Sequence, residues 1–209
     1  MALSNFGELK TAIATLLDRS DLTSNIPDFV SMLEATINRD VLFRNRRMET
    51  TADLTFTGDE ATLPTDFIEA RTLVWKSTPR VRLTYLSPSD FENTYTTDTP
   101  GLPSNFTIYG NTVKVGQYPN SAVGAEMTYY QRLTGLSADT DTNWLLQYHP
   151  DVYLYGAAVH SAPFLQADER LQTWLGLYQN AAAQIAGDDT KARFNGAPIR
   201  QTINVRNIV

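Results

Sequence analysis

Apolar side chains recur every three or four residues at both ends of the chain, the period of a helix, whereas the middle follows a different pattern. Between Asn5 and Asp18 the spacing predicts a helix, with Asn5 and Glu8 placed as a capping box. A polar break over 19–25 precedes a second helix with Pro27 in its first turn. The apolar stripe predicted for this second helix consists of Phe29, Val30, Leu33, Ile37 and Val41. We expect the two helices to pack against each other.

The middle of the chain, 48–136, is rich in threonine and β-branched residues and is interrupted by turn residues, which predicts a sheet. The predicted strands are 48–55, 69–76, 81–86, 106–109, 112–115 and 126–132. Gly110 and Asn111 separate two of these strands and are typical of a tight hairpin. One helical turn is predicted over 88–93.

The helical period returns after Asn143. Residues 151–165 are apolar on nearly every face, so we expect this helix to be surrounded by protein and to end or kink at Pro163. A last helix is predicted over 167–186, with Gly187 as a left-handed cap. The residues beyond it have no helical stripe and end in an alternating pattern that suits an extended strand.

Together these patterns predict an α+β fold. It is a helical bundle of two N-terminal helices (1–47) and two C-terminal helices (137–190), with an inserted antiparallel β-domain (48–136) and an extended C-terminal arm (191–209).

The charge of the chain is negative and unevenly distributed. Its 209 residues include 23 acidic and 17 basic residues, a formal net charge of -6. This balance argues against a protein that coats nucleic acid, whose binding face normally makes the total positive. The last residues differ from the rest, because Lys191, Arg193, Arg200 and Arg206 occur there without a single acid. We therefore expect an acidic body and a cationic arm.

The chain contains no cysteine, which excludes disulfides, thiolate zinc sites, iron–sulfur clusters and cysteine nucleophiles. No apolar run approaches the ~18 residues that span a bilayer, and the first residues have neither a basic nor an apolar targeting region. We expect no membrane contact and a cytoplasm-like compartment.

Catalytic chemistry has little support. The two histidines, His149 and His160, have no serine or aspartate at motif spacing, so a structural or capping role is the commoner explanation. No phosphate-binding glycine motif occurs. We predict no catalytic residue, no cofactor and no metal.

The run from Asp139 to Asn143 resembles the start of a calcium loop, with alternating oxygen ligands. However, Trp144 stands where the sharp turn needs glycine, and Pro150 where a bidentate glutamate belongs. We interpret the run as a polar loop with a helix N-cap at Asp141 or Thr142.

Two further clusters each allow two interpretations. The basic cluster, Arg39, Arg44, Arg46 and Arg47, follows the second helix. Such residues more often complement the helix dipole and pair with carboxylates, but they also suit an acidic partner or phosphates. The aromatic cluster contains Tyr129, Tyr130, Tyr153 and Tyr155. Its spacing fits core packing better than a platform for stacking on sugars or bases.

The order of four segments resembles the head-to-tail adaptor (head completion, tail tubular or connector) proteins of tailed bacteriophages. The segments are LKTAIATLLDRSDLTSNIPDFVSMLEATINRDV, ATLPTDFIEAR, SNFTIYGNTVKVGQYPNSAVGAEMTYYQRLTGLS and TNWLLQYHPDVYLYGAAVHSAPFLQADERLQTWLGLYQNAAAQI. They cover nearly the whole chain, and their succession is far more specific than any one of them.

The resemblance implies a structural virion protein without catalytic residues, assembled in the bacterial cytoplasm. Identical subunits, usually twelve, would form a ring beneath the portal, extend the DNA channel and receive the tail, a nozzle or a stopper. A C-terminal arm would reach the portal, and an acidic channel wall would let DNA slide without specific binding. In this arm we expect two kinds of contact residue. The apolar anchors are Ile199, Ile203, Val205 and Ile208, and the arginines that set the register are Arg193, Arg200 and Arg206. Arg44, Arg46 and Arg47 are candidates for contacts between subunits or with a partner.

Two other classes of protein stay open. One is a non-catalytic glycan-binding β-module of a tail protein, which would expose clustered aromatic side chains. The other is an uncharacterised hydrolase, which would need a polar pocket around His149 or His160.

Overall fold

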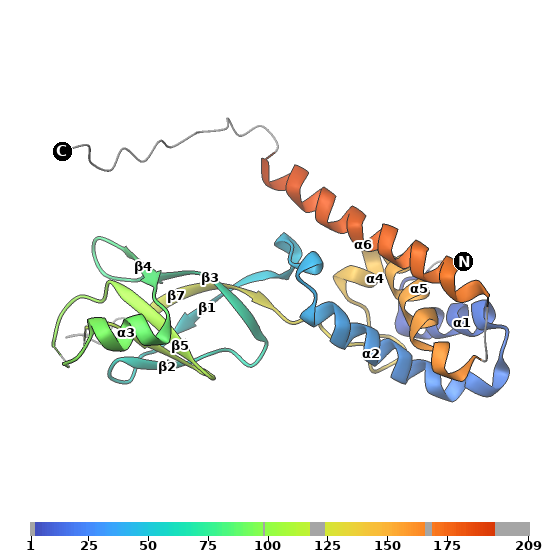
Figure 1. Ribbon diagram of the computed structural model, residues 1–209, viewed down its shortest axis with the longest axis horizontal. Helices are drawn as coiled ribbons and strands as arrows, with labels where there is room; N and C mark the ends of the chain where they lie inside the picture. The colour runs from blue at the N-terminus through green and yellow to red at the C-terminus, as the bar shows by residue number, and fades with distance from the viewer. Residues whose placement is uncertain (1–2, 98, 118–123, 166–168, 195–209) are drawn as a thin grey trace.

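The molecule is elongated, with a β part at one end and a helical part at the other (Figure 1). The computed structural model describes residues 3–97, 99–117, 124–165 and 169–194, and side chains as far as Asp189. Within these residues the chain forms six α-helices and a curled seven-stranded sheet. Here the β part means the sheet with helix α3, and the helical part means the other five helices.

Helix α1 (Phe6–Leu17) begins at the predicted cap. The Asn5 side chain accepts the backbone N–H of Glu8 at 2.9 Å, which satisfies one of the free donors of the first turn. The Glu8 carboxylate completes the box one residue earlier than predicted, because Ser4 donates both its backbone N–H and its hydroxyl to it. The helix ends at Asp18, which adopts a left-handed φ of 53°.

The 3₁₀ helix η1 (Ser20–Asn25) fills the predicted break and leads into α2 (Ile26–Arg39). The helix ends at Asp40, whose backbone is extended and whose carboxylate accepts the N–H of Leu42, the start of η2 (Val41–Phe43). The predicted burial of Val41 is therefore wrong: its side chain is 75% exposed. The turn at Asp40 ends the helical period, so Phe43 enters the core instead.

At the C-terminal end the helices are α4 (Trp144–Tyr148), α5 (Pro150–His160) and α6 (Arg170–Phe194), with η4 (Ala162–Phe164) between the last two. Helix α5 contacts α1, α2, α4 and α6, which confirms that it is surrounded by protein. It ends before Pro163, as predicted. Helices α1 and α2 also contact each other.

Helix α6 does not stop at Gly187, so that prediction is wrong. The helix continues to Phe194, and Gly187 does not take the positive φ of a left-handed cap. A glycine inside a helix costs only about 1 kcal/mol relative to alanine, and the strong helix formers Lys191, Ala192 and Arg193 lie one turn further on. The first residues of the predicted arm, up to Phe194, are thus helical, and 195–209 lie outside the described residues.

The sheet has the strand order β1-β7-β3-β4-β5-β6-β2. Its elements are β1 (Glu49–Leu54), β2 (Glu60–Thr62), β3 (Phe67–Trp75), β4 (Val81–Tyr85), β5 (Asn105–Tyr109), β6 (Thr112–Val115) and β7 (Ala125–Gln131), with α3 (Pro88–Thr94) between β4 and β5. The pairings are antiparallel except between β4 and β5, which run parallel, so the fully antiparallel prediction is wrong. The connection through α3 returns the chain to its starting end, and only such a crossover permits parallel pairing. The predicted hairpin forms, with Gly110 at φ 55°.

Two apolar cores result. One fills the helical part and takes in side chains from both connections to the sheet, among them Phe43, Met48 and Leu133. The other lines the inside of the curled sheet, with Trp75, Val113 and Met127 fully or almost fully buried. The two parts are joined by the chain entering β1 and the chain leaving β7, which pair side by side.

A buried polar network fixes the return from β7 to the helices. One carboxylate oxygen of Glu34 on α2 accepts the Tyr153 hydroxyl at 2.9 Å and the Leu136 N–H at 3.1 Å. The Asn143 amide donates to the Tyr153 oxygen at 2.7 Å and to the Thr134 carbonyl at 2.7 Å. Burial raises the pKa of Glu34, although both hydrogen bonds act in the opposite direction. The network holds α2, α5 and the connecting loop together.

Candidate interaction surfaces

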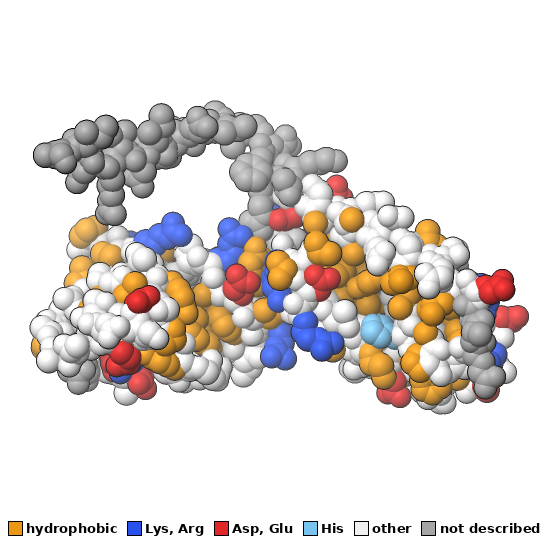
Figure 2. All heavy atoms as spheres, in the orientation of Figure 1, with side chains coloured by type: hydrophobic (Ala, Val, Ile, Leu, Met, Phe, Trp, Pro, Cys, Tyr) orange, Lys and Arg blue, Asp and Glu red, His pale blue; other side chains and the backbone are white. Residues whose placement is uncertain are grey.

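The predicted arginine cluster lies at the waist, the segment 39–48 that joins α2 to β1. Lysine and arginine side chains gather between the two parts of the molecule on the face drawn in Figure 2. Two 3₁₀ turns, η2 and η3 (Arg46–Met48), set the direction of the side chains here, with the Asn45 side chain capping the second by accepting the Arg47 N–H at 2.8 Å. Sequence spacing placed these arginines together, but it did not predict how differently they are exposed.

Arg44 is largely buried, with 10% of its side chain exposed. It donates to the carbonyl of Asn38 at the end of α2 at 2.8 Å, and its Nε lies 3.9 Å from the Glu69 carboxylate on β3. Its Nε and Nη1 have no hydrogen-bond partner among the described residues. These contacts place Arg44 between the helical part and the sheet, which favours a structural role.

Arg46 and Arg47, in contrast, are exposed. The Arg47 guanidinium lies 3.7 Å from the centre of the Tyr148 ring, a cation–π contact. The backbone N–H of Arg46 donates to Asp189 on α6 at 2.8 Å, which fixes this turn against the helix. The waist therefore presents two positive charges from an anchored backbone.

Arg39 follows the commoner interpretation of the cluster. Its Nε donates to the Ala35 carbonyl at 3.0 Å, near the C-terminal end of α2. A cation at this position also complements the negative end of the helix dipole.

The predicted portal-binding residues fall mostly outside the described part of the chain. Arg193 lies within α6, and its side chain is not described. The remaining members, Ile199, Arg200, Ile203, Val205, Arg206 and Ile208, lie outside the described residues.

The two histidines are half-buried and differ in their surroundings. Burial lowers the pKa of His149, with Asp151 and Arg47 as opposing charges nearby. Burial also lowers the pKa of His160, and the positive charge of Arg39 adds to the effect. Among the described residues no three histidine, aspartate or glutamate side chains are grouped so as to hold a metal ion.

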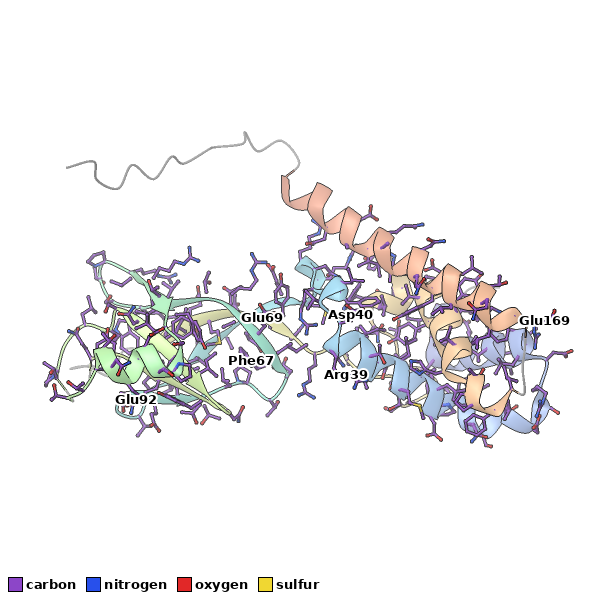
Figure 3. All side chains as sticks on the ribbon, in the orientation of Figure 1. Arg39, Asp40, Phe67, Glu69, Glu92 and Glu169 are labelled. Carbon is purple, nitrogen blue, oxygen red and sulfur yellow. The ribbon has the colours of Figure 1, made fainter. Side chains whose placement is uncertain are left out.

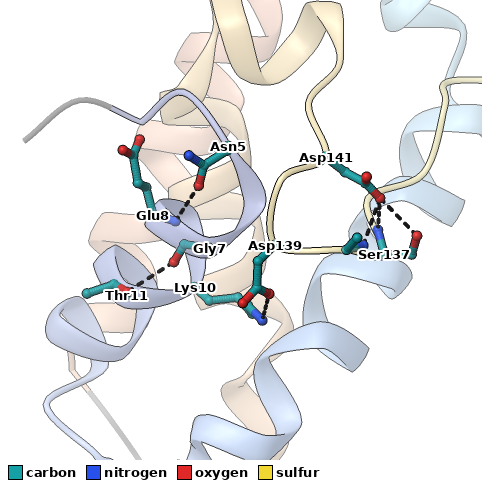
Figure 4. A network of polar contacts seen from close by, with 9 residues as sticks. Asn5, Gly7, Glu8, Lys10, Thr11, Ser137, Asp139 and Asp141 are labelled. Atoms are coloured by element: carbon teal, nitrogen blue, oxygen red, sulfur yellow. Dashed lines mark hydrogen bonds and ion pairs between the residues drawn. The ribbon is translucent and has the colours of Figure 1, made fainter.

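The calcium-like run acts as a clamp on the start of α1 (Figure 4). The carbonyls of Asp141 and Asp139 accept the N–H groups of Phe6 and Gly7, both at 2.9 Å, and the Asp139 carboxylate pairs with Lys10. The Asp141 carboxylate accepts three hydrogen bonds from the preceding turn, two of them from backbone N–H groups. The N-cap of α4 is Asn143, not Asp141 or Thr142 as predicted, because Asp141 is engaged in that turn.

The aromatic cluster belongs to the cores. Tyr129, Tyr130 and Tyr153 are at most 8% exposed, and Tyr155 packs against the helical core. These four rings therefore do not form an exposed stacking platform.

A cleft in the sheet is a feature that the sequence did not reveal. It has a volume of about 770 Å³ and lies between β3 on one side and β4 with β5 on the other. It runs along 67–72 of β3 and is closed opposite by 82–85, Phe106 and Ile108. Phe67 and Glu69 lie on the side of the sheet that faces the end of α2 (Figure 3). The sequence contained one indication of this gap: the predicted strands 81–86 and 106–109 are shorter than the predicted strand 69–76, so they cannot pair along its whole length.

Comparisons with known proteins identify the family of the chain. Among the described helices, none is long and apolar enough to span a bilayer. No curated protein matches the chain. Residues 4–202 match the family described as SU10 adaptor protein. This match covers nearly all of the sequence, including the helices at both ends and the sheet between them. The chain is therefore a member of the SU10 adaptor protein family, a bacteriophage structural adaptor.

Proposed function

We propose that this protein is the head-to-tail adaptor of a virion, forming a ring of identical subunits, usually twelve, beneath the portal. The ring extends the DNA channel and offers the attachment surface for the tail, a nozzle or a stopper. The observation that carries the proposal is the family match over residues 4–202. Helices α1, α2, α5 and α6 would form the bundle, the sheet its inserted domain, and assembly would take place in the host cytoplasm.

The C-terminal arm is the proposed portal contact. After α6, residues 195–209 contain Arg200 and Arg206 but no acid, and their alternation suits an added strand. In this role Ile199, Ile203, Val205 and Ile208 are apolar anchors, while Arg193, Arg200 and Arg206 set the register against an acidic groove.

Contacts within the ring would use the waist. A ring of identical copies needs a heterologous interface, in which two different surfaces of the same chain meet. Arg46 and Arg47 are exposed on a fixed backbone, so they suit an acidic surface of the neighbouring copy. Arg44 is too buried to reach a neighbour and would keep its tie between α2 and β3.

The acidic body suits a channel wall. With a net charge of -6 over the whole chain and a basic arm, the negative excess lies in the residues before the arm. Repulsion between carboxylates and phosphates keeps DNA from adhering while it passes.

The arm is tested by truncation after Phe194, which leaves α6 whole. The purified truncated chain should keep its circular dichroism spectrum and lose binding to portal rings, judged by negative-stain microscopy and co-sedimentation. Reversing Arg200 and Arg206 to glutamate should weaken binding, whereas reversing two exposed arginines outside the arm, Arg80 and Arg132, should not. Unchanged binding by the truncated chain would overturn the role of the arm.

The proposed role needs no catalysis. A double variant, His149→Ala with His160→Ala, should therefore assemble with portal like the unchanged chain and give infectious particles in a complementation assay. Normal assembly with loss of infectivity would instead point to chemistry at one of the histidines.

A further inference from the structure

We propose that the cleft between β3 and β5 accepts an extended segment of another protein, which adds to the sheet as a strand and carries alternating apolar and acidic side chains. That the donor is a neighbouring virion protein rests on the proposed function; the binding mode does not.

The sheet is incomplete at this point. Strand β4 pairs with β3 only through Leu73, Val74 and Trp75, the last three residues of β3. It then pairs with β5 through two residues only, Thr84 and Tyr85. On the side away from β7, residues 67–72 have no ladder partner among the described residues. The cleft is thus bounded by residues 67–72 of β3 on one side and by β4 and β5 on the other, and its two sides meet where β3 pairs with β4.

The cleft runs along one backbone edge of β3. It is lined by six consecutive residues, 67–72, whose edge away from β7 has no ladder partner among the described residues. Two bulges in the pairing with β7 interrupt the alternation of side chains here, which helps to bring consecutive residues to the cleft. Across the cleft, residues 82–85 of β4 already pair with β3 or β5, so the edge on which the proposal rests is that of β3. Unpaired N–H and C=O groups along such an edge are a template for another strand. Six residues correspond to about 20 Å of strand.

One face of an inserted strand would meet apolar side chains. Phe67 and Ala70 pack against the core of the β part from β3, and Ile108 does so from β5. Tyr85, on the opposite side of the cleft, is 53% exposed and lies edge-on to the buried ring of Phe106. Apolar side chains at alternate positions of the guest would cover these groups and remove them from water.

The other face would meet positive charge. Arg82 is exposed and alternates with the buried Leu83, and its guanidinium makes no hydrogen bond or ion pair with a described residue. On the β3 side, Arg71 is held by the Glu49 carboxylate and the Tyr130 hydroxyl, at 2.8 and 2.7 Å. Glu69 lies within 3.9 Å of Arg44. The uncompensated charge of the lining is therefore that of Arg82, which favours carboxylates on the guest.

The same charge disfavours the chain's own arm as the occupant. Residues 195–209 alternate well enough to form a strand, but their charged side chains are Arg200 and Arg206. With Ile203 and Val205 turned inward, Arg206 would lie on the face of Arg82. The cleft and the arm therefore suit different partners.

The test uses the full chain and three fluorescein-labelled seven-residue peptides. In the acidic peptide, valine alternates with glutamate, and in the basic peptide, valine alternates with lysine. The third peptide has the sequence of the acidic one but is N-methylated at every second residue, which removes the N–H groups along one edge of the strand. Fluorescence anisotropy should show the acidic peptide binding about tenfold more tightly than the basic one, a difference of ~1.4 kcal/mol. The N-methylated peptide should not bind, and the acidic peptide should protect amides of 67–72 from hydrogen exchange.

Two charge reversals provide matched variants. Arg82→Glu should reverse the preference between the acidic and the basic peptide, whereas Arg80→Glu, at an exposed arginine outside the lining, should leave it unchanged. Binding of the N-methylated peptide, or protection elsewhere than 67–72, would overturn the proposal. Binding of a peptide of residues 201–209 in preference to the acidic one would also overturn it and assign the cleft to the arm. Because these measurements need no ring, they stand apart from failure of the portal assay.

Discussion

Gly156 lies where α5 packs tightly against α2 and α6, so the effect of a single added methyl group on stability should be measurable. A Cβ at this position would lie 2.6 and 2.8 Å from the two methyl carbons of Leu33 on α2, and 3.1 Å from the ring of Tyr178 on α6. Leu33 is fully buried, so its side chain has no solvent-filled space to move into. The Gly156→Ala variant must therefore push apart packed side chains.

Two opposing effects set the size of the change. Adding a methyl group to a packed core costs about 1–3 kcal/mol, whereas alanine is better than glycine in a helix by about 1 kcal/mol. We expect a net loss of stability of about 0–2 kcal/mol. Gly176 and Gly187 provide controls within α6, since nothing lies within 4 Å of a Cβ built at either. Alanine at each control position should raise stability by about 0.5–1 kcal/mol.

A second substitution tests whether Leu33 is the cause. Leu33→Ala alone should cost about 2–5 kcal/mol, because it leaves a cavity between α2 and α5. In that background a methyl group at position 156 has room, so Gly156→Ala should change sign and stabilise by about 1 kcal/mol. A coupling of this sign is expected only of residues in contact.

The assay is urea unfolding followed by far-ultraviolet circular dichroism, with the free energy taken from linear extrapolation. If Gly156→Ala stabilises the unchanged chain as much as the two α6 controls do, the added methyl group meets no resistance at this position. If the effect of Gly156→Ala is the same with and without Leu33, the leucine is not the cause of the destabilisation.

Three further variants test local features by the same unfolding measurement. Burial raises the pKa of Glu34, so the native state binds the carboxyl proton more tightly than the unfolded state does. The free energy of unfolding should therefore fall as the pH rises from 4.5 through the raised pKa, and Glu34→Gln should remove that fall. Asp141 should have the opposite pH dependence, because three hydrogen-bond donors lower the pKa of its carboxyl group. Its contribution to stability is present above pH 3.8 and is lost on acidification below that value, so Asp141→Asn should weaken the loss of stability at low pH. Gly124→Ala should destabilise by about 1–3 kcal/mol, because its Cβ would lie 2.6 Å from the Leu54 carbonyl oxygen on the paired strand.

The sequence predicted those features of the fold that depend on local chemistry. Asn5 caps α1, Pro163 lies beyond the end of α5, and Gly110 forms the hairpin, because in each case the residue's own side chain or backbone preference decides the geometry. The prediction for Gly187 was wrong for a related reason. A glycine that is favourable as a cap is also tolerated inside a helix, and the residues around it decide between the two.

Tertiary contacts determined what the sequence could not show. Val41 continued the helical stripe, but the Asp40 carboxylate turned the chain and exposed it. The four-arginine cluster was visible as a pattern, yet only the packing separates the buried Arg44 from the exposed Arg47. The cleft depends on strands distant in sequence and on a parallel pairing made through α3, neither of which leaves a periodic signal.

The pairing of β1 with β7 has a consequence for how this protein can change over time. Glu49, the first residue of β1, lies opposite Tyr130, near the end of β7, so the chain leaves the sheet beside the place where it entered. Such partners are about 5 Å apart. A recombination event that replaced everything between them would have to match only two adjacent ends. Recombination can thus exchange the surface of the sheet for one that binds a different partner. The helices and their binding surfaces are inherited unchanged in such an event.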